Sequence, residues 1–451
     1  MKLFALKQST VGHNGIGLWA HPASRAREYR TMGYHLDLAR LLENGGFDGV
    51  FFADVLGVLD LYGGSMDAAL RDGVQVPEDD PLLAISAMAA VTSRLTFAVT
   101  ASTSYEQPYT FARKMTTLDH LTNGRIGWNI VTSALESAAR NLGYDALPPH
   151  DERYEVAEEF LEVTYQLWEA SWADDAVVDD PVSRVYIDPS RVRPVRHFGK
   201  YFTVPDAALS EPSAQRTPVL FQAGTSGAGL AFAGRHAEGV FVSGYRPELV
   251  RKQVERVRDA AAAAGRSRRS VSCLAIVTVV TAPTDSEAAE KYAGMREYVS
   301  VEGALARYSA ILNIDLAALD PDAPLTASLA GGGGIQGLVD MFTRLDATTT
   351  WTPRAIGQFV AIGGGGPVLV GSPATVVDQL VRWQRVADLD GFNVADPLPG
   401  VTLDDFAALI VPELRRRGLV DPPGAPRSFR EVLTGAGPRV AADHPAASAR
   451  L

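Results

Sequence analysis

The sequence predicts an α/β protein built as a (β/α)₈ barrel, and three observations lead to this fold class. Short runs of β-branched and aromatic residues alternate with longer segments of helical periodicity along most of the chain. Several of these runs, such as GVFFAD and LAIVTVV, are almost wholly apolar, which is typical of parallel strands covered on both faces. Eight such runs joined by right-handed crossovers favour a closed barrel, with an open doubly wound sheet of two domains as the alternative.

The strands are predicted, in chain order, at residues 3–8, 48–54, 95–100, 126–131, 218–222, 239–243, 271–280 and 391–396. The helices between and after them are predicted at 31–45, 81–92, 108–121, 151–171, 226–237, 246–264, 285–299, 373–387 and 403–417. In the 151–171 segment, Val156, Phe160, Val163 and Leu167 form one apolar stripe, so this helix packs one face on the barrel.

Two long segments interrupt the alternation. Residues 173–217 are polar and rich in proline, and residues 300–366 contain two glycine runs. Segments of this length inside a compact domain are usually functional or disordered. We therefore predict a single barrel domain over 1–434 with two insertions, followed by a flexible tail over 435–451 that is rich in Ala, Pro and Gly.

Composition excludes several classes of protein. The 451 residues are 46% hydrophobic and carry a net charge of −11, which argues against global disorder and against binding to nucleic acid. No apolar run approaches the ~18 residues of a membrane span, and the start lacks a signal peptide, so we expect a cytoplasmic protein. One cysteine, Cys273, and the absence of HExxH or other ligand spacing among the eight histidines predict no metal site.

Motifs for nucleotides and for serine hydrolysis are weak. Gly332-x-Gly334-x-x-Gly337 matches a dinucleotide fingerprint, but no convincing strand precedes it and no acidic residue follows at the required spacing. The nucleoside-triphosphate P-loop pattern is absent. Residues 224–227 resemble a nucleophile elbow, except that Ala228 replaces its last glycine.

Polar residues at the carboxyl ends of the predicted strands define a candidate pocket, because this end of a barrel holds the chemistry. They are Asp54, Thr100, Asn129, Gly224 and Ser226. Gly224 lets the backbone approach a ligand, and the helix after Ser226 offers free N–H groups to an anion; the alternative is that Ser226 is only a helix N-cap. His150 and Tyr154, four residues apart at the start of the longest helix, can donate to the same anion.

Ten motifs in a fixed order make the chain resemble a known family. They are Tyr62–Ser65, Asp80–Pro81, Thr100–Tyr109, Leu118–Arg125, Gly127–Ser133, Ala139–Asn141, His150–Tyr154, Gln222–Ser226, Gly371–Pro373 and Asp390–Val394. Over roughly residues 1–418 the chain is similar to the nitrilotriacetate and dimethyl-sulfide monooxygenase group of the bacterial-luciferase-like superfamily, which use reduced FMN.

The resemblance implies a luciferase-like barrel whose carboxyl end binds reduced FMN. It places Asp54, Thr100 and Asn129 around the isoalloxazine and ribityl chain, and His150, Tyr154 and Ser226 at the phosphate. The expected reaction uses O₂ as co-substrate and passes through a flavin (hydro)peroxide, so the protein needs no metal or strong nucleophile. His13 and His21 are weak candidates for proton transfer, and the catalytic residue is otherwise unknown.

The resemblance also implies partners. A separate NAD(P)H:flavin reductase is expected to supply the reduced FMN, and a homodimer or homotetramer is expected. The substrate is predicted to be a small organic or heteroaromatic compound, such as a sulfide, sulfone, amine or riboflavin-like molecule, in which a C–N or C–S bond is cleaved. The 300–366 insertion is a candidate lid. The alternatives are a non-catalytic flavin-binding protein and an F420-dependent oxidoreductase on the same barrel.

Overall fold

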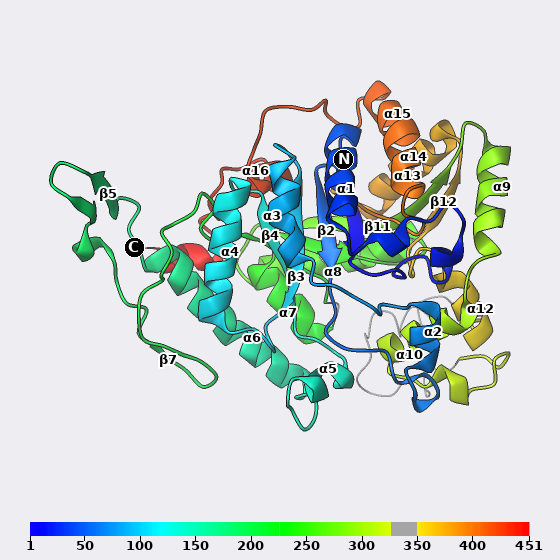
Figure 1. The fold of residues 1–451 in the computed structure, drawn as a ribbon, viewed down its shortest axis with the longest axis horizontal. Helices are drawn as coiled ribbons and strands as arrows, with labels where there is room; N and C mark the ends of the chain where they lie inside the picture. The colour runs from blue at the N-terminus through cyan, green and yellow to red at the C-terminus, as the bar shows by residue number, and fades with distance from the viewer. Residues whose placement is uncertain (225, 326–349, 451) are drawn as a thin grey trace.

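The structure, a computed structural model, describes residues 1–224, 226–325 and 350–450. Within these ranges eight parallel strands close into a barrel in the order β1-β2-β3-β4-β9-β10-β11-β13, with β13 paired to β1 (Figure 1). They are β1 (Lys2–Gln8), β2 (Gly49–Ala53), β3 (Thr96–Ser102), β4 (Ile126–Val131), β9 (Val219–Gln222), β10 (Gly239–Val242), β11 (Ser272–Thr281) and β13 (Gly391–Ala395). All eight predicted strands are present, and the closed barrel is confirmed over the open sheet.

Helices cover the outside of the barrel. They are α1 (Met32–Gly45), α3 (Leu82–Ala90), α4 (Pro108–Thr122), α6 (His150–Tyr165), α7 (Gly227–His236), α8 (Pro247–Ala263), α9 (Asp285–Arg296), α13 (Pro373–Ala387), α14 (Thr402–Asp405) and α15 (Val411–Arg416). The predicted stripe of α6 is only partly right: Phe160 and Val163 are fully buried, and Leu167 lies in a π-helical turn, Gln166–Ala170, that continues the helix.

One strand of the main sheet was not predicted. β12 (Val368–Gly371) pairs in parallel with the last four residues of β11, which is ten residues long and extends beyond its barrel partners. The VLVG run follows directly on the second glycine run, and four residues give too short a periodicity to distinguish it from the preceding loop. Because β12 lies outside the closed ring, the barrel itself is unaffected.

A short helix closes the amino-terminal end of the barrel. In α16 (Phe429–Thr434), the Ser428 side chain and the Glu431 side chain form a capping box. The Phe429 ring lies 5.7 Å from the ring of Phe4 and 5.3 Å from that of Phe221. Because these aromatic side chains fill the amino-terminal end, a ligand cavity inside the barrel can open only at the carboxyl end.

The segment after α16 differs from the predicted flexible tail. Val440, His444 and Ala446 are buried. The His444 ring nitrogen Nε2 lies 2.8 Å from the carbonyl of His236, and Arg450 hydrogen-bonds Glu169. The prediction was wrong for 435–450, because low-complexity composition hides the few side chains that anchor the segment; Leu451 lies outside the described residues.

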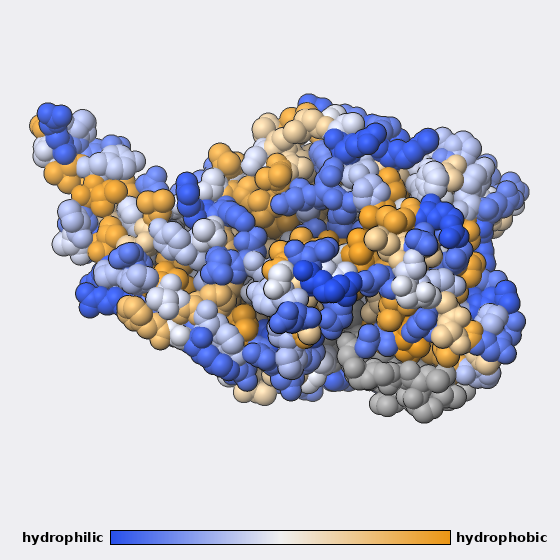
Figure 2. Space-filling view, turned by 60° about the horizontal axis from the view of Figure 1, so that its bottom comes forward, coloured by the Kyte–Doolittle hydropathy of each residue, from blue (hydrophilic) through white to orange (hydrophobic). Residues whose placement is uncertain are grey.

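The two insertions have different structures. The first forms a hairpin arm of β5 (Val177–Asp180) and β6 (Val185–Ile187) that extends away from the barrel (Figure 1), and the smaller hairpin β7 (His197–Phe198) and β8 (Thr203–Val204) follows. Apolar side chains are exposed on the arm (Figure 2).

The second insertion contains α10 (Val301–Leu312) and α12 (Pro353–Val360), which share a small core. Residues 326–349, with the first glycine run and the dinucleotide-like motif, lie outside the described residues. Every helix in the described part of the chain is too short or too polar to cross a bilayer.

Candidate flavin site

A cavity of about 330 Å³ opens at the carboxyl end of the barrel. Its wall is formed by residues that follow β2, β3, β4 and β9, with one side of α10. Most lining side chains are small or apolar, and a few polar groups lie among them. The lining residues are Asp54, Val55, Leu56, Leu59, Gln75, Thr100, Ala101, Ser102, Ile130, Val131, Thr132, Ser133, Ala134, Leu135, Ala138, Tyr154, Gln222, Ala223, Gly224, Ala310 and Ile311. An apolar cavity with a few fixed polar groups suits an extended planar ligand.

Thr100 and Asn129 lie side by side because β3 and β4 pair in register at these two residues. The Asn129 amide donates to the Thr100 hydroxyl at 3.1 Å, and that hydroxyl donates to the Phe52 carbonyl at 2.9 Å. Thr100 lines the cavity, whereas Asn129 does not, so the structure places Asn129 behind the residue it orients. Asn129 Oδ1 is buried without a hydrogen-bond partner, which leaves an acceptor unused in the barrel interior.

At the far end of the cavity the structure brings His150, Tyr154 and Ser226 together. Ser226 is the N-cap of α7 and accepts a hydrogen bond from the N–H of Gly229 at 3.0 Å. Its hydroxyl also lies 3.2 Å from His150 Nε2 and hydrogen-bonds the Tyr154 hydroxyl. Three polar side chains and the first N–H groups of a ten-residue helix therefore meet at one point, an arrangement that suits an anion.

Gly224 lies where the chain passes between β9 and α7 and is packed closely against two polar side chains. A Cβ atom at this position would lie 2.4 Å from Gln222 Nε2 and 2.8 Å from the Tyr154 hydroxyl, so no larger residue fits without displacing them. Its N–H donates to Gln222 Oε1 at 2.6 Å, which fixes the side chain that donates to Tyr154. The predicted approach of the Gly224 backbone to a ligand stays a prediction.

Arg153 was not predicted from the sequence. Its guanidinium is buried and donates to the carbonyl of Ser133 and, at 3.3 Å, to that of Thr132, both of which line the cavity. Burial lowers the pKa of Arg153, and its Nε has no hydrogen-bond partner. The residue lies between the predicted His150 and Tyr154, and the only signal for it was this position within the same short motif.

The two histidines proposed for proton transfer do not line the cavity. His21 Nδ1 accepts the N–H of Ala23 at 3.1 Å, and its ring packs on Tyr298, so it stabilises a turn. Burial, with the charge of Arg307, lowers the pKa of His13 well below its ordinary value, so its ring is neutral at pH 7. Asp54, in contrast, is on the wall, and burial together with Asp80 raises its pKa to about 6.

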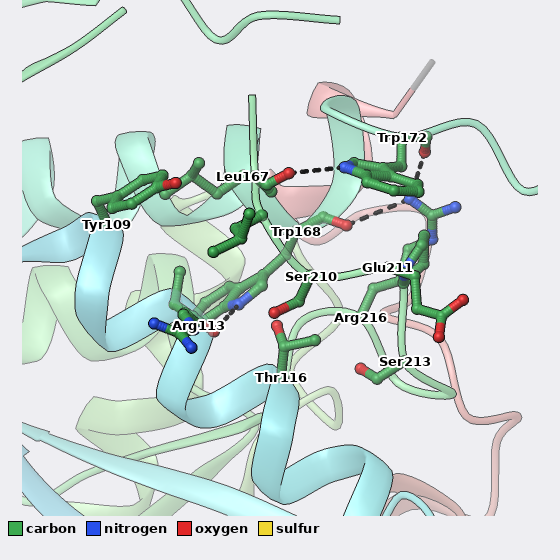
Figure 3. Close-up of a pocket in the computed structure, with 14 residues that line it drawn as sticks. Tyr109, Arg113, Thr116, Leu167, Trp168, Trp172, Ser210, Glu211, Ser213 and Arg216 are labelled. Atoms are coloured by element: carbon green, nitrogen blue, oxygen red, sulfur yellow. Dashed lines mark hydrogen bonds between the residues drawn. The ribbon is translucent and has the colours of Figure 1, made fainter. Parts of the chain in front are cut away.

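A second crevice, on the outside of the barrel, has a different character (Figure 3). It lies between α4, the π-helical turn and the first insertion, and it is lined by Tyr109, Trp168, Trp172 and Arg216. The Trp172 indole donates to the Ala208 carbonyl at 2.9 Å, and Arg216 donates to the Trp172 carbonyl at 2.7 Å. These groups bind the insertion to the barrel, and the crevice, of about 20 Å³, has room for little more than a water molecule.

No group of three or more His, Cys, Asp or Glu residues in the described ranges is arranged to hold a metal ion.

Comparison with known proteins identifies the family. Residues 13–388 match the model of the luciferase-like monooxygenases. The chain belongs to this family. It is 46% identical over 449 residues to the dimethyl-sulfide monooxygenase of Hyphomicrobium sulfonivorans, covering 99% of this chain and 93% of that protein. It is 42% identical to the long-chain alkane monooxygenase of Geobacillus thermodenitrificans strain NG80-2, covering 99% of this chain and 97% of that protein.

Solved structures agree with these relatives. The crystal structure of a riboflavin lyase with modified FMN and riboflavin superposes with a TM-score of 0.93 at 35% identity, covering 100% of this chain and 99% of that one. The family, the luciferase-like barrel, the monooxygenase class and FMN as the cofactor, with O₂ as co-substrate, are thereby confirmed. The cavity fits this cofactor, because the Gly224 passage and the α7 terminus, with its three polar side chains, lie at one end of an apolar cavity.

Proposed function

We propose that the protein is the oxygenating component of a two-component system, in which a separate NAD(P)H:flavin reductase supplies reduced FMN. The proposal rests on one observation. His150, Tyr154 and Ser226 meet at the start of α7, directly beside the apolar cavity at the carboxyl end of the barrel. A phosphate at the helix terminus and a ring system in the cavity together match one ligand. The long-chain alkane and dimethyl-sulfide relatives support the same reaction class.

In this proposal each side chain has a defined task. Ser226, Tyr154 and His150 hold the phosphate, with the N–H groups at the start of α7. Thr100, oriented by Asn129, and Asp54 face the ring and ribityl end. The bound FMN supplies the activation of O₂, while the protein excludes water and orients the substrate. Ala310 and Ile311 of α10 bring the second insertion to the cavity wall, which supports its proposed role as a lid.

The substrate proposed is a small organic or heteroaromatic molecule with little negative charge. Among the described residues that line the cavity there is no Lys or Arg, whereas Val55, Leu59, Ile130, Leu135 and Ile311 are apolar. A polycarboxylate would be desolvated there without a cation to pair with it, which costs several kcal/mol per charge. A sulfide, an alkane or a flavin-like ring is uncharged and therefore does not need a cation in the cavity wall.

The experiment is an anaerobic titration followed by turnover. Reduced FMN is expected to bind more tightly than reduced riboflavin, because only FMN has the phosphate. With a generic flavin reductase, NADH and O₂, dimethyl sulfide, a long-chain alkane and riboflavin are then supplied separately, and products are identified by mass spectrometry with ¹⁸O₂. Incorporation of one labelled atom into a product supports the proposal. Equal affinity for FMN and riboflavin, or FMN oxidation without any labelled product from these classes, contradicts it.

Gly224→Ala is expected to weaken FMN binding about tenfold. The added methyl group has to displace the Gln222 amide and the Tyr154 hydroxyl, and overpacking of this kind costs about 1–3 kcal/mol, with 1.4 kcal/mol per tenfold in affinity. The matched control is Gly294→Ala, in α9 and outside the cavity lining, where nothing lies within 4 Å of an added Cβ, so the affinity should change by less than about twofold. Flavin fluorescence measures the FMN affinity of both variants. Equal losses of affinity would show that the close packing at Gly224 does not contribute to FMN binding.

A further inference from the structure

Two carboxyl groups at the cavity wall hydrogen-bond each other. Asp54 lines the cavity, and the side chain of Glu78 lies behind it. Two ionised carboxylates have only acceptor oxygens, so a direct hydrogen bond between them requires that one of the two carries a proton.

The surrounding contacts show which oxygen is available for that proton. The Gln8 amide donates to Glu78 Oε1 at 2.7 Å, so this oxygen acts as an acceptor. Glu78 Oε2 is buried, and no N–H or O–H of the described protein is donated to it. An ionised carboxylate oxygen that is buried without a hydrogen-bond donor carries a large desolvation cost. The protonated oxygen of a carboxylic acid does not need such a donor.

The hydrogen-bonded chain returns to the cavity at its other end. Gln75 Nε2 donates to Gln8 Oε1 at 2.9 Å, and Gln75 itself lines the cavity. Gln75 has φ of 52°, a left-handed conformation that costs a non-glycine residue about 1 kcal/mol, and its N–H donates to the Gly12 carbonyl at 2.9 Å. Asp54, Glu78, Gln8 and Gln75 thus form a connected path that starts and ends at the wall.

The charges around the pair favour one shared proton. Burial and the neighbouring Asp54 raise the pKa of Glu78 to about 9, while burial and Asp80 raise that of Asp54 to about 6. Arg307, on α10, is the cation that faces Glu78. At neutral pH the arrangement therefore holds one negative charge on Asp54 and the proton on Glu78.

We propose that Glu78 is the proton store of the flavin site and acts through Asp54. The O–H bond of Glu78 breaks as an O–H bond forms on Asp54, and Glu78 becomes a carboxylate that accepts from Gln8. The pair keeps one proton and one negative charge in this step. When Asp54 passes the proton to the contents of the cavity, a buried dianion is left, and uptake of one proton from solvent restores the pair. The use of this proton in oxygenation rests on the proposed function. The location of the proton on Glu78 does not depend on that function.

The location is tested on the protein without flavin, using Glu78→Gln, which preserves the shape and the contact with Gln8. The infrared band of a protonated carboxylic acid at neutral pH should be lost in this variant. Between the ordinary Glu pKa of 4.5 and about 9, the folded protein keeps a proton that the unfolded chain releases, so stability should fall as pH rises. In Glu78→Gln, the part of this pH-dependent loss of stability that comes from Glu78 should be absent.

The matched control is Asp48→Asn, which alters a buried carboxyl at the opposite end of the barrel whose pKa burial also raises. It should leave the Glu78 infrared band in place. If Glu78→Gln leaves both the infrared band and the pH dependence of unfolding unchanged, Glu78 is ionised and the proposal fails. The infrared and unfolding measurements need neither flavin nor substrate. They therefore distinguish failure of this inference from failure of the proposed function.

The role in turnover is tested with the substrate found for the parent protein. Glu78→Gln should lower kcat by about 100-fold, the low end of general-acid effects, with KM and the affinity for reduced FMN within about twofold. In the parent protein kcat should fall as pH rises through about 9, where Glu78 loses its proton, and this fall should be absent in Glu78→Gln. Asp48→Asn should retain the parent profile. Loss of the infrared band with unchanged kcat and pH profile would show that Glu78 holds a proton but does not supply it, and would overturn the role.

Discussion

Arg430→Ala is expected to reduce the free energy of unfolding by about 3–5 kcal/mol, a large part of the total for a domain. Arg430 Nε lies 2.6 Å from Glu238 Oε1, and Nη2 lies 2.9 Å from Glu238 Oε2. Both side chains are almost fully buried, at 1% and 6% exposure. Burial alone would raise the pKa of Glu238, but the charge and hydrogen bonds of Arg430 hold it below its ordinary value. Without Arg430 this buried carboxylate loses the cation that hydrogen-bonds both of its oxygens.

Urea unfolding followed by circular dichroism measures this effect, and two further variants define its origin. Arg430→Met combined with Glu238→Gln removes both charges and should lose less stability than Arg430→Ala, because no ion is left unpaired. Arg251→Ala breaks an exposed pair with Glu255 and should change stability by less than about 0.5 kcal/mol. If Arg430→Ala behaves like Arg251→Ala, the ion pair does not hold α16 against the barrel.

The importance of Arg430 shows where sequence reasoning reaches its limit. The eight strands were predictable because each is a short and mostly apolar run, and burial on both faces requires that pattern wherever the strand lies. α16 has only six residues, too few for a periodicity, and its place in the fold depends on Phe429 meeting Phe4 and on Arg430 meeting Glu238. Contacts between residues hundreds of positions apart leave no local signal.

The same distinction applies to the site. Asp54, Thr100 and Gly224 could be placed because each follows a recognisable strand, and parallel strands end at one rim. Glu78 could not, because it lies in an irregular loop and becomes significant only through its contacts with Asp54 and Gln8. Asn129 was placed on the correct strand, but the period of two does not tell whether a side chain inside a barrel reaches the cavity or lies one layer below it.

Ser226→Asp is expected to weaken FMN binding about 100-fold at low salt. Aspartate is as good an N-cap as serine, so α7 should retain its first turn. The new carboxylate, however, would occupy the place of the hydroxyl that faces His150 and Tyr154, where the phosphate is proposed to bind. Two like charges at contact distance cost several kcal/mol, and each 1.4 kcal/mol is tenfold in affinity.

Riboflavin, which has no phosphate, separates this repulsion from general damage. Its affinity should change by less than about threefold in Ser226→Asp, whereas the affinity for FMN falls. Ser226→Asn has the same cap geometry without the charge, and should bind FMN within about tenfold of the parent protein. Raising the salt concentration should recover part of the lost FMN affinity, because screening weakens repulsion at a partly exposed site. Equal losses for FMN and riboflavin would mean that the phosphate does not lie at the start of α7, and the flavin would then have to be placed in the barrel in another orientation.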